Sequence, residues 1–243
     1  MKTIYKILSG CVVLSSVAIL PAFASAVTVT NPGFCANLNT FYTQFYPAVQ
    51  QNVANLQSKI QQNGGLIKSV RAKEDQALAT ARTNANTRKE QYYTQLETKA
   101  TTDEQKSAVQ TFEASIDAAV LAKQSAIDAA IKTYRDGIDA IVAQEQPIIQ
   151  QAGPVFQSAA KAAFDKATSS CNSGTSSTTV KATLKSDLKA AKDQFKSAVN
   201  AGNAINSQIN TLKSARNAAY NAAASAYRTS VQVATTTLKV AFQ

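Results

Sequence analysis

Histidine and tryptophan are absent from all 243 residues, and methionine occurs once. Without histidine the chain cannot carry a Ser-His-Asp triad or a histidine-ligated metal ion. It also lacks a glycine-rich phosphate loop and a Cys-x-x-Cys pair. Two Ser-x-x-Lys spacings, at Ser158 and Ser186, lack the companion motifs of penicillin-binding enzymes. We therefore predict a protein that is not an enzyme and that uses no cofactor and no metal.

Glycine and proline are also scarce, with eight and five residues respectively. Few positions therefore interrupt a helix, and residues with high helix propensity dominate the middle of the chain. The alternation of apolar and polar residues that indicates strands is rare. The composition predicts an all-α fold.

Long apolar runs are missing except near the start, where a basic hexapeptide precedes an apolar run from Ile7 to Leu20. This run is too short to span a membrane as a helix, and small residues typical of signal-peptidase sites follow it. We predict that residues 1–26 are a cleaved signal peptide. The mature chain 27–243 is then exported to the periplasm, the cell surface or the medium. Cys11 follows Leu-Ser-Gly as in a lipidation motif, but most of the apolar run comes after it, which favours ordinary cleavage.

The tripeptide Ile-Asp-Ala occurs three times at intervals of eleven residues, beginning at Ile116, Ile127 and Ile138. Eleven residues in three turns is 3.67 per turn, so the repeat keeps one apolar stripe on a nearly straight helix. The stripe extends from about residue 105 to 167, with Lys123 and Glu145 as polar exceptions.

The aspartates of the repeat, Asp117, Asp128 and Asp139, are about 16 Å apart on a helix. Neighbouring carboxylates at that distance cannot share a substrate or a metal ion. We interpret them as part of a solvent-exposed face.

A heptad pattern, typical of a coiled coil, runs from Leu184 to Leu238, with Arg216 as its polar member. A capping sequence at residues 101–105 and a loop at 169–177 separate three segments of similar length. The predicted helices are therefore about 34–100, 103–168 and 178–241. Equal helices with short connections favour an elongated antiparallel three-helix bundle that forms a single domain over 27–243.

Helix-breaking residues fall at a similar level in all three segments of this bundle. They are Gly64, Gly65, Pro147, Gly153, Pro154 and Gly202. We predict a shared kink at that level. If these residues form full turns instead, the alternative fold is a shorter bundle of five or six helices.

Two cysteines, Cys35 and Cys171, remain after removal of the signal peptide. An even count in an exported chain indicates a disulfide, and both residues lie at one end of the predicted bundle. We expect this disulfide, with two free buried thiols as the alternative.

The chain is basic, with a formal net charge of +10. Five lysines of the third segment follow one helical face: Lys181, Lys185, Lys189, Lys192 and Lys196. One interpretation is that their stems cover the heptad seam. The other is a docking strip for an anionic partner. Nucleic acid is disfavoured, because no nucleic-acid-binding motif is present.

Aromatic residues concentrate near Cys35, and most are expected to plug one end of the bundle. Tyr42 and Tyr46 are the candidates for an exposed partner patch.

Together these features predict a non-enzymatic exported scaffold, spacer or binding protein of the cell envelope. Its expected partner is another envelope protein, an anionic surface polymer or lipid. The alternatives are a periplasmic chaperone of the basic helical type and an amphipathic lipid-binding protein, since eleven-residue repeats also occur in the latter.

Overall fold

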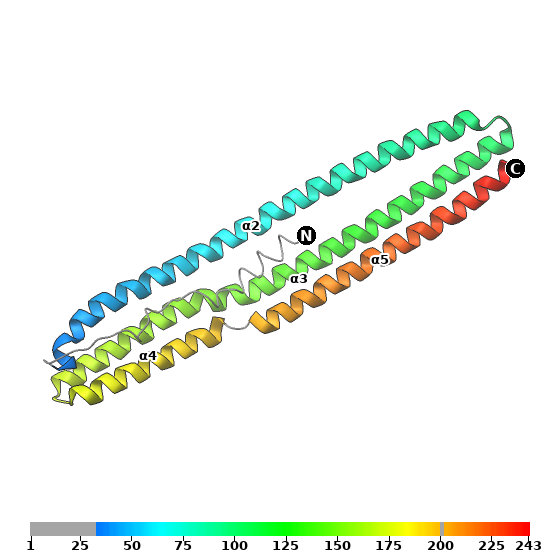
Figure 1. Cartoon of the computed structure of the whole chain (residues 1–243). Helices are drawn as coiled ribbons and strands as arrows, with labels where there is room; N and C mark the ends of the chain where they lie inside the picture. The colour runs from blue at the N-terminus through cyan, green and yellow to red at the C-terminus, as the bar shows by residue number, and fades with distance from the viewer. Residues whose placement is uncertain (1–32, 200–201) are drawn as a thin grey trace. The chain divides into compact units, whose positions relative to one another are not determined.

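The computed structural model describes residues 33–199 and 202–243, and these contain four helices and no strand (Figure 1). The helices are α2 (Phe34–Lys99), α3 (Asp103–Asn172), α4 (Ser177–Val199) and α5 (Gly202–Ala241). The predicted all-α fold is confirmed. The predicted signal peptide and Cys11 lie outside the described residues.

The first two predicted segments correspond to α2 and α3, whereas the third is described as two helices, α4 and α5. Residues 200 and 201, between them, lie outside the described residues. α3 continues to Asn172, so the predicted loop at 169–177 begins too early. The buried Ala167 and the disulfide-bonded Cys171 hold this last turn in place.

The ends of α3 and α4 are capped as their sequences indicate. At the start of α3, the Thr102 hydroxyl accepts a hydrogen bond from the Gln105 amide, and the Gln105 side chain accepts one from the Thr102 amide. This reciprocal pair is a capping box. After α3, Gly174 has a φ of 82°, a conformation that glycine adopts without strain. The Ser176 hydroxyl then accepts from the Thr179 amide at the start of α4.

All but one of the glycine and proline residues that are candidates for full turns lie inside helices, and the exception is Gly202. Gly64 and Gly65 are within α2, and Pro147 and Gly153–Pro154 are within α3. Gly202 begins α5. The alternative with five or six helices is therefore not found in the described part of the chain.

The chain divides into two compact units. Among the described residues, unit 1 contains 33–68, 141–199 and 202–206, and unit 2 contains 69–140 and 207–243.

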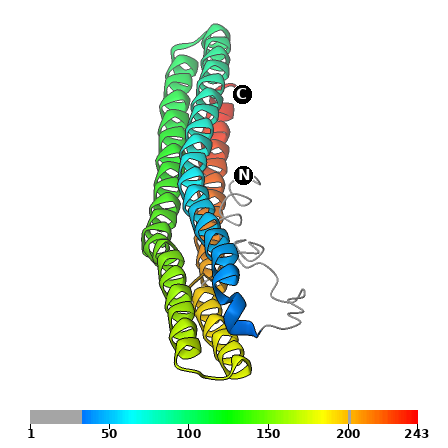
Figure 2. The same ribbon diagram turned by 90° about the vertical axis from the view of Figure 1, so that its left-hand side faces the viewer.

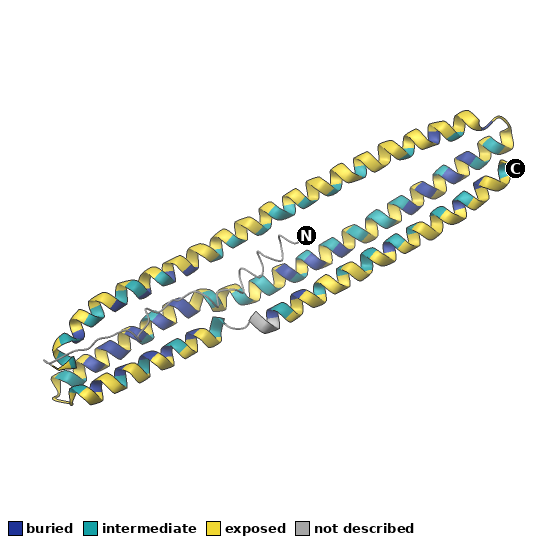
Figure 3. Ribbon diagram, viewed as in Figure 1, coloured by how far each residue is buried: buried dark blue, intermediate teal, exposed yellow. Residues whose placement is uncertain are grey.

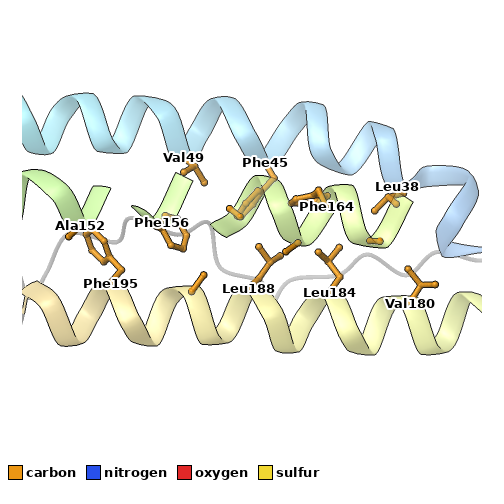
Figure 4. Packing of buried hydrophobic residues seen from close by; sticks show 14 of the residues in the cluster. Leu38, Phe45, Val49, Ala152, Phe156, Phe164, Val180, Leu184, Leu188 and Phe195 are labelled. Atoms are coloured by element: carbon orange, nitrogen blue, oxygen red, sulfur yellow. The ribbon is translucent and has the colours of Figure 1, made fainter. Parts of the chain in front are cut away.

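In unit 1 the first part of α2, the last part of α3 and α4 lie side by side (Figures 1 and 2). Figure 4 shows aromatic and aliphatic side chains of all three helices meeting in one core. α4 contributes its heptad positions Leu184, Leu188 and Phe195, and α3 contributes Phe156 and Phe164 from the eleven-residue phase. The two periods read from the sequence therefore point inward as predicted.

Unit 2 combines the last part of α2, the first part of α3 and most of α5. Its apolar cluster centres on Tyr93, Val109, Phe112, Ile116 and Leu238. α2 contributes little to this cluster, because Tyr93 is its only buried residue between 69 and 99. Figure 3 shows this part of α2 as largely exposed. Apolar packing of α2 in unit 2 is therefore limited to a few residues such as Tyr93 and Leu96, and polar contacts add to it.

Candidate functional site

Cys35 and Cys171 form the predicted disulfide, with their Cα atoms 5.6 Å apart. Cys35 lies in the first turn of α2 and Cys171 in the last turn of α3. The bond therefore ties the beginning of one helix to the end of the next, beside the loop that leads into α4.

Tyr42 and Tyr46 stack on each other with ring centroids 5.2 Å apart. Tyr42 also meets the ring of Phe164 edge-on at 5.1 Å. Both tyrosines are half-buried. The stacking against α3 favours the interpretation as an aromatic plug, while a role in partner binding stays a prediction.

The five lysines of the predicted strip lie along α4, and all are exposed except Lys192, which is half-buried. Lys189 forms an ion pair with Asp193 on the same helix. The hydrogen bond from Lys189 lowers the pKa of the Asp193 carboxyl, and the charges of Lys196 and Lys192 act in the same direction. The positive charge of the strip therefore favours the ionised form of a carboxylate beside it.

The other acidic residue of α4, Asp187, pairs with Lys166 of α3 at 2.8 Å. Within the described ranges, none of the remaining strip lysines forms an ion pair: these are Lys181, Lys185, Lys192 and Lys196. The part of α2 in unit 1 offers no compensation, because residues 33–68 contain no Asp or Glu. The strip therefore presents positive charge that its own unit does not neutralise.

In unit 2 the aspartates of the eleven-residue repeat bind α2. Arg71 donates to both carboxylate oxygens of Asp139 at 2.9 and 2.8 Å. Arg82 donates in the same way to Asp128 at 3.1 and 2.7 Å. Lys89 pairs with Asp117.

The interpretation of these aspartates as a merely solvated face is therefore incomplete. Their carboxylates remain about half exposed, but each bridges to a cation on α2. A step of eleven residues from Asp139 to Asp128 matches a step of eleven from Arg71 to Arg82. Two of the three repeats thus pair in step with α2, whereas the third aspartate meets Lys89, which follows Arg82 after seven residues. The arginine spacing was the signal in the sequence that could have revealed the pairing.

Two of the polar exceptions in the apolar stripes, Lys123 and Arg216, pair with aromatic rings. The Lys123 ammonium of α3 lies 4.5 Å from the ring centroid of Tyr227 on α5. Reciprocally, the Arg216 guanidinium of α5 lies 4.5 Å from the ring centroid of Tyr134 on α3. Cation–π contacts therefore accommodate both charges within the α3–α5 seam.

A carboxylate-rich contact surrounds Tyr93 in unit 2. The Tyr93 hydroxyl donates to Asp117 at 3.1 Å. Burial raises the pKa of Glu113, and the charges of Glu97, Asp117 and Glu90 add to that effect. Glu113 is therefore a group whose ionisation opposes folding.

Among the described residues, apolar grooves lie on the surface of each unit. In unit 1 a groove of about 380 Å³ lies between α3 and α4, with Ile148, Val155 and Phe195 in its lining. In unit 2 a groove of about 350 Å³ lies between α3 and α5. Across residues 33–199 and 202–243, no cluster of three or more His, Cys, Asp or Glu residues is placed to hold a metal ion. No helix in the same ranges has an apolar stretch long enough to cross a membrane.

Comparisons of the chain with protein-family models, with curated proteins and with solved structures find no match.

Proposed function

We propose that the protein is a non-enzymatic helical scaffold or binding protein, exported to the cell envelope, which docks an anionic partner on the lysine strip of α4. The observation that carries the proposal is the charge balance of unit 1. Four strip lysines form no ion pair with any described residue of unit 1, and the neighbouring part of α2 has no acidic residue. If these lysines served only to cover the heptad seam with their stems, an excess of positive charge on this side of unit 1 would have no role.

The geometry of the strip suits an extended partner. From Lys181 to Lys196 the strip covers about 22 Å, given the rise of 1.5 Å per residue. A lysine close to an anionic surface contributes about 1 kcal/mol, so the four lysines without partners contribute about 4 kcal/mol together. That contribution equals roughly a thousandfold gain in affinity, and it falls as salt screens the charges.

The disulfide supports export, because such bonds persist in oxidising compartments and are rare in the cytosol. The signal sequence predicted for residues 1–26 supports the same location.

The test compares two variants of equal charge. Lys185, Lys192 and Lys196 are replaced together by Gln, which leaves the Lys189–Asp193 pair intact. The matched control replaces Lys59, Lys68 and Lys73 of α2, all of which are exposed. Binding is measured to anionic vesicles, to zwitterionic vesicles and to a soluble polyphosphate.

We expect the strip variant to lose about a hundredfold in affinity for one of the anionic probes, at unchanged helicity, and the α2 control to lose far less. Binding to vesicles alone identifies a headgroup surface, and binding to polyphosphate identifies the anion itself. Equal losses of affinity in both variants, or no binding of the original protein to either anionic probe, would show that the strip is not a docking surface.

A chaperone of the basic helical type is the second candidate. The unit 1 groove favours it, because Ile148 and Val155 are each 43% exposed beside the groove they line. An apolar groove near positive charge suits unfolded polypeptide segments. Replacement of both residues by Ser should then abolish the suppression of aggregation of an unfolded client protein.

The elongated antiparallel three-helix rod predicted from the sequence also remains part of the proposal. The helix lengths support it, since 66 and 70 residues correspond to roughly 100 Å each if straight. Small-angle scattering should give a radius of gyration of about 30 Å for a rod of that length. A compact domain would give about 18 Å.

A further inference from the structure

The lysine strip lies on the side of α4 that faces α2. Each strip lysine directly follows a buried residue of α4, and these buried residues are Val180, Leu184, Leu188, Ala191 and Phe195. Asp187 and Gln194 instead directly precede buried residues, and both meet α3, Asp187 through Lys166 and Gln194 in the groove of unit 1. Neighbouring residues of a helix are about 100° apart, so the lysines lie on the opposite side of the seam. In unit 1 that side is the one toward α2.

The side of α2 that faces α4 is identified in the same way. Tyr46 directly follows the buried Phe45 and stacks on Tyr42, whose ring meets Phe164 of α3. Residues of α2 that follow a buried position therefore lie toward α3. Residues that precede one lie toward α4.

Amide side chains occupy that side of α2 at the level of the strip. Gln44 and Asn55 directly precede buried residues, and both are exposed. α2 and α4 both run antiparallel to α3 and start side by side, since a Cβ on Gly33 would lie 2.6 Å from the Ser177 Oγ (Figure 1). An equal count of residues from this contact places Gln44 within one residue of the level of Lys189, and Asn55 near the far end of the strip.

The strip lysines together with Gln44 and Asn55 form a surface that we call the α2–α4 rim. No large apolar side chain is exposed on α4 or on residues 34–65 of α2. A helix that docks on a lipid bilayer buries apolar side chains among the headgroups in addition to placing charges there. The one aromatic residue of α4, Phe195, is buried, so the strip offers no platform on which nucleic-acid bases could stack. The rim therefore suits a chain of anions without apolar or aromatic groups.

The shape of the charge distribution favours a linear partner. The strip is about 22 Å long and follows one side of a single helix. Residues 33–68 of α2 add only two lysines, eleven Asn and Gln residues and no carboxylate. A bilayer presents its charges in two dimensions, whereas a linear polymer presents them in a row.

The type of cation favours phosphate. α4 contains no arginine, whose planar fork matches a carboxylate, and its lysines are point charges that bind phosphate in any orientation. The amides of the rim add hydrogen-bond donors for phosphate oxygens. We propose that the α2–α4 rim binds a linear phosphate polymer, extended along α4. This proposal rests on the proposed docking role of the lysine strip.

The test measures binding of inorganic phosphate chains to the disulfide-bonded protein by titration calorimetry. The probes are pyrophosphate, chains shorter than the strip and chains several times longer. Affinity should rise with chain length until the strip is covered and then change little. For four lysine contacts, the logarithm of the association constant should fall with the logarithm of the salt concentration with a slope of about −3, at about 0.7 for each contact.

Two double variants of equal charge test the position of the rim. Gln44→Glu with Asn55→Glu places two carboxylates beside the strip. The matched control is Gln50→Glu with Gln57→Glu, because these exposed residues follow buried positions and so lie on the other side of α2. At about 0.1 M salt each phosphate contact contributes about fivefold, so the rim variant should lose about twentyfold in affinity for the long chains and the control far less. Circular dichroism checks that both variants keep their helicity.

The outcomes separate this proposal from the docking role on which it rests. Binding to vesicles of phosphatidylglycerol but not to phosphate chains overturns the phosphate polymer and leaves the lysine strip as a docking surface. Affinity that does not depend on chain length, or equal losses in the two double variants, overturns the extended polymer on the rim. Binding to neither probe overturns both proposals.

Discussion

The attachment of α2 to α3 in unit 2 should depend on a specific set of ion pairs, and exchanging one pair tests this. Asp128→Arg alone removes the contact with Arg82 and places two cations opposite each other. Arg82→Asp alone places two anions there. The double exchange restores an ion pair with its polarity reversed.

The magnitude follows from the exposure of the pair. The Asp128 side chain is 53% exposed and that of Arg82 is 29% exposed, so solvent screens much of their attraction. Exposed pairs contribute about 0.2 to 1 kcal/mol, and the two parallel contacts place this pair near the upper limit. With a repulsion of similar size, each single reversal should cost about 1.5 kcal/mol. The double exchange should recover most of that loss.

Urea unfolding followed by circular dichroism measures the cycle at about 0.1 M and about 1 M salt. The Debye length falls from about 10 Å to about 3 Å between these conditions, so the coupling should fall by half or more. Asp136→Lys is the control, since Asp136 pairs with Lys132 within α3 and its reversal, loss of the pair plus repulsion, should cost only about 0.6 kcal/mol. A double exchange that is no more stable than the single reversals would refute the proposed register.

Three further outcomes are expected. Reduction of the disulfide, which joins residues separated by 136 positions, should lower the free energy of unfolding by about 5 kcal/mol at most, measured by urea titration with and without reductant. Gly153→Ala should lower the free energy of unfolding by about 1 to 3 kcal/mol, because the new Cβ would lie 2.7 Å from a methyl carbon of the stiff Val53 side chain. Gly65→Ala places its Cβ in open space and should raise the free energy of unfolding by about 1 kcal/mol. Glu113→Gln should stabilise the protein at neutral pH. The pKa of Glu113 is raised in the folded state, so its ionisation destabilises the fold at neutral pH. This destabilisation disappears as the pH falls from the folded pKa to below the unfolded value of 4.5. In thermal melts, the extra stability of Glu113→Gln should disappear over the same pH range. If Glu113→Gln remained more stable than the original sequence well below pH 4.5, an effect other than the ionisation of Glu113 would be responsible.

Local signals in the sequence were sufficient for most helix boundaries. The capping residues at 101–105 define the start of α3, and the apolar periods identify the inward faces of α3 and α4. The described end of α3 was missed, because the disulfide and the packing of the last turn extend a helix into a run of serines whose local preferences favour a loop. Tertiary contacts overrode propensity at that point.

The ion pairs between α2 and α3 were missed for a different reason. A periodic aspartate on one helix shows only which face it occupies, and its partner depends on how two helices align. The disulfide was predictable, because two cysteines leave one pairing and both lay at the same end of the expected bundle.

The most direct test of the proposed function is a lysine footprint. An amine-reactive label and mass spectrometry report the reactivity of each lysine with and without anionic vesicles or polyphosphate. We predict that Lys181, Lys185 and Lys196 become several-fold less reactive when the partner is bound, while Lys59 and Lys68 of α2 keep their reactivity. Protection of all lysines to the same extent, or protection that leaves α4 unchanged, would contradict the assignment of α4 as the docking face.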